Sequence, residues 1–143
     1  MTWLPPGYEL SDDQARVDAA AAHAYLARSY WSPGIPLATV ETAIANSLSV
    51  AVFHGGEQVA MARVVTDRAT FAYLADVYVL EEHRGRGLSK AMLAHLQDRP
   101  DLQGLRRWML FTREAHALYE RFGWAGSRHP ERLMLRENPD AYA

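Results

Sequence analysis

The chain carries, at residues 76–93, the sequence DVYVLEEHRGRGLSKAML, which is the most informative part for the fold. Its first residues close an apolar and aromatic run, Thr70–Leu80, of the kind that predicts a strand buried on both faces. Its last residues carry apolar side chains at helical spacing and predict a helix over Arg86–Gln97, which Pro100 ends. The order of strand, glycine-containing turn and helix is typical of an anion site, because N–H groups at a helix N-terminus point outward without partners.

The turn itself has the chemistry of a phosphate site. Gly85 and Gly87 allow the backbone to come close to a phosphate. Arg84, Arg86 and Lys90 add charged donors, so we expect a pyrophosphate there. The competing interpretation is an ordinary helix entry with solvated basic residues. Neither GxxxxGK[ST] nor a full GxGxxG is present, which disfavours a P-loop nucleotidase and a dinucleotide site.

The remaining sequence predicts further helices and strands around this centre. The capping-box sequence Ser11-Asp12-Asp13-Gln14 predicts a helix from about Asp12 to Arg28, and Ser32-Pro33-Gly34 predicts a break. A second helix is expected from Pro36. The other expected elements are a short strand near Tyr8–Leu10, a hairpin of Ser49–His54 and Gln58–Thr66 around Gly55-Gly56, a strand Arg107–Phe111, a helix Glu114–Phe122 that Gly123 caps, and a strand Arg132–Arg136. Together they predict one mixed α/β domain over residues 1–143.

Composition narrows the function classes. The 143 residues have a net charge of −2 and no cysteine. The charge argues against bulk binding of nucleic acid, which needs an excess of lysine and arginine. The lack of cysteine excludes disulfides, thiolate metal ligands and a cysteine nucleophile. It also fits a reducing compartment. Residues 1–10 show no signal pattern, and no apolar run reaches the ~20 residues of a membrane span. We therefore expect a cytoplasmic protein with no membrane and no nucleic-acid partner.

Residues 76–93 resemble the acetyl-CoA motif of the GNAT N-acetyltransferase superfamily. That motif is Arg or Gln, two variable residues, Gly, one variable residue, and Gly or Ala; here it is met by Arg84 and Gly87, with Ser89 as a small departure. A second stretch, residues 115–124 (AHALYERFGW), resembles the Ala…Leu-Tyr-Glu-x-x-Gly-Phe segment of the same family. Thr112 stands where many members carry Asn. The resemblance extends from about residue 48 to residue 136.

The resemblance implies a fold and a cosubstrate. The expected fold is a GNAT-like mixed sheet flanked by helices, mostly antiparallel, with a splayed parallel strand pair formed by Thr70–Leu80 and Arg107–Phe111. The cosubstrate is acetyl-CoA, with no metal. The pantetheine arm is expected in the gap, along Val77, Tyr78 and Val79. The expected pyrophosphate contacts are Arg84, Gly85, Arg86, Gly87, Leu88, Ser89 and Lys90, with Thr112 as a further CoA contact.

The implied reaction is direct attack of an amine on the thioester carbonyl. It needs a route for the ammonium proton, a donor for the oxyanion and an acid for the leaving thiolate. Tyr119 matches the family's tyrosine acid, although it also lies on an apolar helical stripe. A backbone N–H near Val77 or Tyr78 is the expected oxyanion donor. Asp76, an acid inside an apolar run, is a candidate base; His116 and a chain of waters are alternatives.

The acceptor is expected in the N-terminal half. Tyr30 and Trp31 lie near a chain reversal, where aromatic faces bind an ammonium by cation–π contact; packing against the core is the competing role. Asp67 and the arginines of Arg63–Arg68 form a second candidate for reading a charged substrate. The leading hypothesis is an N-acetyltransferase for a small-molecule or peptide amine. The alternatives are a GNAT-like CoA sensor or interaction module and, less favoured, a DNA-binding protein. The oligomeric state stays open, with a homodimer as one expectation.

Overall fold

The computed structural model describes residues 4–143; residues 1–3, which the sequence analysis placed in the same domain, lie outside the described part. A five-stranded sheet has the order β1-β2-β3-β4-β5. Its strands are β1 (Tyr8–Ser11), β2 (Leu48–His54), β3 (Glu57–Thr66), β4 (Phe71–Val79) and β5 (Arg107–Met109). The first four pair antiparallel, and β5 runs parallel to β4. The predicted mixed α/β fold is confirmed.

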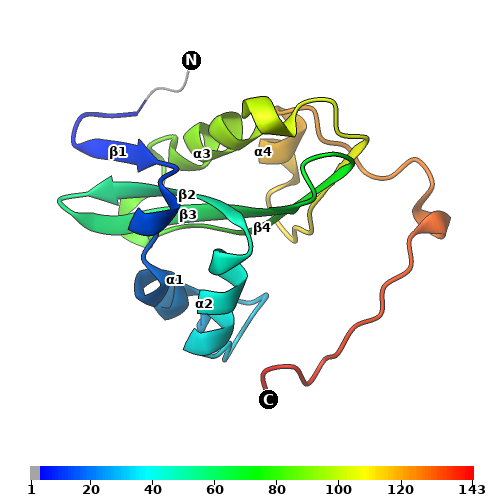
Figure 1. The fold of residues 1–143 in the computed structure, drawn as a ribbon, viewed down its shortest axis with the longest axis horizontal. Helices are drawn as coiled ribbons and strands as arrows, with labels where there is room; N and C mark the ends of the chain where they lie inside the picture. The colour runs from blue at the N-terminus through cyan, green and yellow to red at the C-terminus, as the bar shows by residue number, and fades with distance from the viewer. Residues whose placement is uncertain (1–3) are drawn as a thin grey trace.

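Helices cover both faces of the sheet (Figure 1). The helices α1 (Ala19–Leu26) and α2 (Leu37–Ala45) lie on one face, and α3 (Leu88–Gln97) and the short α4 (His116–Glu120) lie on the other. Each face has its own apolar cluster: Met61 and Tyr78 pack toward α1 and α2, whereas Val64 and Leu74 pack toward α3. The strands are therefore buried on both faces, as their near-continuous apolar runs predict.

The predicted hairpin and its turn are confirmed. β2 and β3 pair through His54↔Glu57 around Gly55-Gly56, where both glycines have positive φ (59° and 82°). A two-residue turn with positive φ at both positions matches the twist of the strands it joins. Gly123 likewise has a φ of 91° after α4, as the predicted left-handed cap requires.

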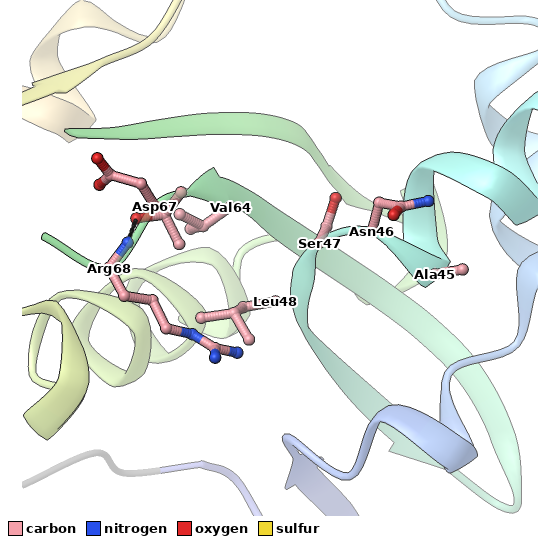
Figure 2. A pocket seen from close by; sticks show the side chains of 8 residues that line it. Ala45, Asn46, Ser47, Leu48, Val64, Asp67 and Arg68 are labelled. Carbon is pink, nitrogen blue, oxygen red and sulfur yellow. Dashed lines mark hydrogen bonds between the residues drawn. The ribbon is translucent and has the colours of Figure 1, made fainter. Parts of the chain in front are cut away.

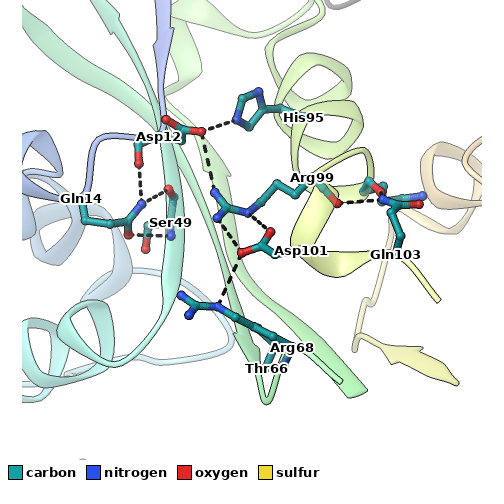
Figure 3. Close-up of polar contacts among 10 residues, drawn as sticks. Asp12, Gln14, Ser49, Thr66, Arg68, His95, Arg99, Asp101 and Gln103 are labelled. Carbon is teal, nitrogen blue, oxygen red and sulfur yellow. Dashed lines mark hydrogen bonds and ion pairs between the residues drawn. The ribbon is translucent and has the colours of Figure 1, made fainter. Parts of the chain in front are cut away.

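The predicted helix from Asp12 to Arg28 is wrong over its first third. A short 3₁₀ turn, Gln14–Arg16, ends at Val17, which is extended, and α1 begins only after Asp18, whose side chain accepts from the N–H of Ala21 at 3.0 Å. The cause is tertiary. Gln14 uses its amide on the sheet, donating to the carbonyl of Ser49 and accepting from its N–H, both at 2.9 Å (Figure 3).

The predicted strand Arg132–Arg136 is also wrong. A 3₁₀ turn, Pro130–Arg132, is followed by chain without regular structure, and Figure 1 shows this segment standing away from the sheet. A strand needs a neighbour to hydrogen-bond, and none of the described strands lies beside it.

A polar network fixes the C-terminal end of α3 (Figure 3). Asp12 accepts from His95 at 2.9 Å and lies 3.7 Å from Arg99, and Arg99 pairs with Asp101 at 2.9 Å. Arg68, in the turn between β3 and β4, reaches Asp101 at 3.5 Å. These contacts tie the C-terminal end of α3 to the segment that follows β1 and to the turn between β3 and β4.

Candidate acetyl-transfer site

The gap between β4 and β5 is the centre of the site. The two strands pair at only three positions, Phe71↔Arg107, Ala72↔Trp108 and Tyr73↔Met109, after which β5 ends and β4 continues to Val79. This is the splayed parallel pair that the sequence predicted. The edge of β4 that faces β5 is left without a neighbouring strand from Leu74 onward, and its backbone groups there can bind an extended ligand.

The loop at the end of β4 has the geometry of an anion site. Gly85 and Gly87 have φ of 76° and 80°, and Gly87 is the residue from which α3 starts. The first helical hydrogen bond runs from the N–H of Ala91 to the carbonyl of Gly87 at 3.0 Å. Within residues 4–143, the N–H groups of Leu88, Ser89 and Lys90 have no acceptor. Three donors therefore point out of the helix end, where the dipole favours negative charge.

The arginine that opens the motif is exposed, but its guanidinium is hydrogen-bonded to the rest of the protein. Arg84 donates from Nε to the carbonyl of Val79 at 3.1 Å and from Nη2 to the hydroxyl of Tyr25 at 2.8 Å. Tyr25 in turn stacks on Tyr78, with ring centroids 4.6 Å apart. Arg84 thus ties the loop to β4 and α1. This tether was not predicted, because the partners are 59 residues apart in sequence.

The other basic residues of the loop lie at its surface. Arg86 is exposed, with its guanidinium 5.9 Å from the ring of Tyr8, and Lys90 is exposed on the first turn of α3. Both side chains are therefore free to reach a bound anion. Thr112 is half-buried, and its hydroxyl accepts from the N–H of Ala115 at 3.0 Å, which fixes the turn before α4.

Asp76 lies at a bulge in β4. Its φ is 54°, and the pairing register with β3 shifts between Met61 and Arg63. A bulge re-aims a side chain, and Asp76 meets Arg63 Nε at 2.6 Å through Oδ2 and the indole Nε1 of Trp31 at 3.0 Å through Oδ1. Arg63 also donates to Ser47 at 3.1 Å. Asp76 thus has the partners that a mostly buried carboxylate requires.

Aromatic side chains surround this ion pair. Trp31 lies edge-on to Tyr30, with ring centroids 5.1 Å apart, and Tyr73 lies edge-on to Phe111 at 6.1 Å. Burial raises the pKa of Tyr73, and the charge of Asp76 adds to the rise. The structure brings Trp31 against Asp76 and Tyr30 against Trp31, a placement that the sequence did not predict. It adds Tyr73, which sequence reasoning missed because the bulge that turns Asp76 to its side leaves no signal in the residue pattern.

Tyr119 lies on α4 and is 8% exposed. Its ring packs against Trp124, with centroids 6.1 Å apart, and its hydroxyl has no hydrogen-bond partner within residues 4–143. Burial raises the pKa of the Tyr119 phenol, and the charge of Tyr30 adds to the rise. The phenol is therefore protonated at neutral pH. His116 is exposed at the first residue of α4.

Asp67 has a structural role. It accepts from the N–H groups of Ala69, Thr70 and Phe71 and from the Thr70 hydroxyl, and these bonds lower the pKa of its carboxyl. A small pocket of about 240 Å³ lies beside this turn (Figure 2) and is lined by Ala45, Asn46, Ser47, Leu48, Val64, Thr66, Asp67 and Arg68. It contains neither the glycine loop nor Tyr119, so we assign it no part in the chemistry.

The described residues hold no cluster of three or more histidine, aspartate or glutamate side chains that would bind a metal ion. In the same part of the chain, no helix has the length and apolar character needed to cross a bilayer.

Comparison with known proteins identifies the class. The fold is that of the GNAT acetyltransferases. The family model of the acetyltransferase (GNAT) family matches residues 9–124, so this chain belongs to the GNAT family. A candidate acetyltransferase of Gibberella zeae, FG08082, is 31% identical over 140 residues, which cover 82% of this chain and 78% of that protein.

Solved structures agree. A candidate GNAT-family acetyltransferase from Xanthomonas campestris pv. campestris shares 47% identity and superimposes with a TM-score of 0.92, covering 96% of this chain and 98% of that one. A candidate acetyltransferase from Clostridium acetobutylicum, solved with acetyl-CoA, has 15% identity and a TM-score of 0.65 over 92% of this chain and 94% of its own. At that identity the second likeness concerns the fold alone.

Proposed function

We propose that this protein is an acetyl-CoA-dependent N-acetyltransferase that acetylates a primary amine of a small molecule or peptide. The observation that carries the proposal is the junction of β4 and α3, where a glycine loop with three free N–H donors adjoins an unpaired strand edge. One part suits a pyrophosphate and the other an extended amide-bearing arm, and CoA contains both. The acetyl-CoA bound to the Clostridium acetobutylicum protein of the same fold supports this choice.

Two stretches of the chain would bind the cosubstrate. The backbone of Gly85, Gly87, Leu88, Ser89 and Lys90 would bind the pyrophosphate, with Arg86 and Lys90 adding charge. Val77, Tyr78 and Val79 would bind the pantetheine arm through the edge of β4, and Thr112 would adjoin it. We assign Arg84 the task of holding the loop, because its guanidinium already donates to Val79 and Tyr25.

The reaction would proceed by direct attack. The acceptor ammonium first loses a proton to water. The neutral amine nitrogen then bonds to the thioester carbonyl carbon, the C–S bond breaks, and the thiolate takes a proton from the hydroxyl of Tyr119. The second proton leaves the nitrogen as the amide forms and returns through water to the Tyr119 oxygen. A backbone N–H of Val77 or Tyr78 would stabilise the oxyanion. The hydroxyl of Tyr119 is available for the acid role because it is unpartnered within the described residues and because burial, by raising its pKa, keeps it protonated.

Asp76 is assigned to the acceptor side. Trp31 and Arg63 each donate to one carboxylate oxygen of Asp76, which makes Asp76 a poor base. We propose that Asp76 orients Trp31, so that Trp31 and Tyr30 form an aromatic wall for the amine.

We also propose that the enzyme works as a homodimer.

The test is turnover with a panel of amines. Purified protein with acetyl-CoA and each amine should release free thiol, and mass spectrometry should find the acetylated amine. A protein whose melting temperature rises with CoA, but which releases no thiol with any amine of a broad panel, would instead be the CoA sensor.

A further inference from the structure

Four aromatic side chains from three separate parts of the chain lie around Asp76, and we call them the aromatic quartet. Tyr30 and Trp31 come from the loop between α1 and α2, and their rings lie edge-on with centroids 5.1 Å apart. Tyr73 of β4 and Phe111, which follows β5, form a second edge-on pair at 6.1 Å. Neither pair is formed by neighbouring turns of one helix, so the fold itself brings the two pairs to one place.

Three contacts join the segments of the quartet into a closed circuit. The indole of Trp31 donates to Asp76 at 3.0 Å, which links the α1–α2 loop to β4. The second aromatic pair links β4 to the segment after β5. The N–H of Arg113 donates to the hydroxyl of Tyr30 at 3.2 Å, and its guanidinium lies 3.8 Å from the centre of the same ring, which links that segment back to the loop. The circuit holds the rings in place before any substrate arrives.

The quartet is accessible to solvent. Phe111 is 54% exposed, Tyr30 and Trp31 are also exposed, and Tyr73 is half-buried. Val65, the register partner of Tyr73 on β3, is exposed as well and lies on the same face of the sheet. Exposed apolar side chains gathered in this way mark a binding site.

The quartet adjoins the groups to which we assign the chemistry. Asp76 directly precedes Val77, one of the two proposed backbone donors for the oxyanion. Tyr30 raises the pKa of the Tyr119 phenol through its charge, so the two hydroxyls are near enough to interact. A molecule bound at the quartet therefore has the acetyl-transfer site as its neighbour.

The charges at the quartet are already compensated. The two oxygens of Asp76 accept from Trp31 and Arg63. Glu114, the acid beside the circuit, pairs with Arg113 at 3.1 Å. A polyamine or a lysine-rich peptide brings several ammonium groups, which bind best to unpaired carboxylates. Aromatic faces with compensated charges instead complement a molecule with one amine and an apolar body.

We propose that the acceptor is an arylalkylamine, a primary amine joined by a short carbon linker to an uncharged aromatic ring. The substrate ring packs between the two pairs of the quartet, edge-on or offset, at the centroid separations of about 4.5–7 Å that aromatic rings prefer. The linker spans the step along β4 from Asp76 to Val77, which is about 3.3 Å and suits a linker of about two carbons.

The fate of the amine rests on the proposed function, whereas binding of the ring to the quartet does not. Calorimetric titration of 2-phenylethylamine into the protein saturated with CoA measures that binding without turnover. The matched ligand is 2-cyclohexylethylamine, which has the same carbon skeleton and charge but no aromatic ring. It should bind about fivefold more weakly, because aromatic pairs gain more than their buried area provides. Equal or tighter binding of 2-cyclohexylethylamine or of spermidine would overturn the inference.

Variants on the two sides of the quartet locate the binding. Trp31→Leu and Phe111→Leu should each weaken binding of 2-phenylethylamine about tenfold, because each removes one aromatic face. Trp31→Phe keeps a ring and loses the hydrogen bond to Asp76, so it should bind more tightly than Trp31→Leu. The control is Leu37→Ala, which removes an equally exposed apolar side chain from α2, outside the circuit, and should leave binding unchanged. Wild-type affinity in both leucine variants would place the amine elsewhere and overturn the inference.

Turnover separates this inference from the proposed function. With acetyl-CoA, 2-phenylethylamine should have a higher kcat/KM than ethylamine, glucosamine or spermidine, with the difference from ethylamine mainly in KM. A protein that binds 2-phenylethylamine at the quartet but releases no thiol would support the site and contradict acetyl transfer. A protein that acetylates ethylamine or spermidine as well as 2-phenylethylamine would retain the proposed function and overturn the aromatic acceptor.

Discussion

Arg63 and Asp76 form an ion pair of 2.6 Å at the bulge of β4, with only 16% and 12% of their side chains exposed. Asp76→Asn should lower the free energy of unfolding by about 3 kcal/mol, because Arg63 keeps its charge and loses its counterion. Asparagine is the proper replacement, since it tolerates the φ of 54°. Urea unfolding measures the loss.

The double variant Arg63→Met with Asp76→Asn is the control for the Asp76→Asn prediction. Removal of both charges should cost less than the sum of the two single changes, because no unpaired ion remains. Strict additivity would show that the pair contributes nothing as a pair.

The tether between Arg84 and Tyr25 gives a second prediction. Tyr25→Phe removes the 2.8 Å hydrogen bond but keeps the ring stacked on Tyr78. A hydrogen bond to a charged group contributes about 1.5–3 kcal/mol, so KM for acetyl-CoA should rise about tenfold through a loosened loop, with kcat little changed. Steady-state kinetics checks this, with the exposed phenol variant Tyr142→Phe as control. An unchanged KM would mean that the loop holds its shape without the hydrogen bond to Tyr25.

The acid role of Tyr119 predicts a pH profile. Tyr119→Phe should lower kcat about a hundredfold, as is typical for loss of a general acid, and should leave the melting temperature unchanged because only an unpartnered hydroxyl is removed. Since burial raises the pKa of this phenol above its ordinary value of about 10, the wild-type rate should fall only in strong alkali, and that alkaline limb should be missing in the variant. Equal turnover of the two proteins would remove Tyr119 from the chemistry.

The buried phenol of Tyr78 should make the free energy of unfolding depend on pH in alkali. Burial raises its pKa to about 12, against about 10 in an unfolded chain, so the folded protein favours the neutral phenol. Its contribution to stability is complete below pH 10 and is lost as the pH rises through 12, by up to about 2–3 kcal/mol. Chemical unfolding at pH 9 and pH 11.5 should show a steeper loss for the wild type than for Tyr78→Phe. Parallel losses would contradict the assignment.

The sequence predicted the features that depend on neighbouring residues and missed those that depend on residues far apart in the chain. Periodicity and turn chemistry located the hairpin at Gly55-Gly56 and the loop at Gly87, because these depend on neighbouring residues. The helix start failed at Gln14, whose amide pairs with Ser49, 35 residues away. The bulge that turns Asp76 toward Arg63 and Trp31 is likewise a tertiary event.

The two terminal segments both have the composition of a strand, but only the N-terminal one forms a strand. Tyr8–Ser11 finds a partner in β2 and becomes a strand. Arg132–Arg136 has the composition of a strand and remains unpaired, because composition does not reveal whether an edge is within reach. Tyr30, Trp31 and Tyr119 were identified as candidates, whereas their mutual placement required the structure.

Calorimetric titration of CoA into the wild type, Ser89→Ala and Ser89→Glu tests whether the Arg84–Ser89 loop binds the phosphates of the cosubstrate. Ser89 lies in the first turn of α3, where a glutamate stabilises the helix and its carboxylate repels a pyrophosphate. We predict that Ser89→Ala binds CoA like the wild type and that Ser89→Glu, while equally stable, binds at least a hundredfold more weakly. Equal CoA affinity of Ser89→Glu and the wild type would contradict the assignment of the phosphates to this loop.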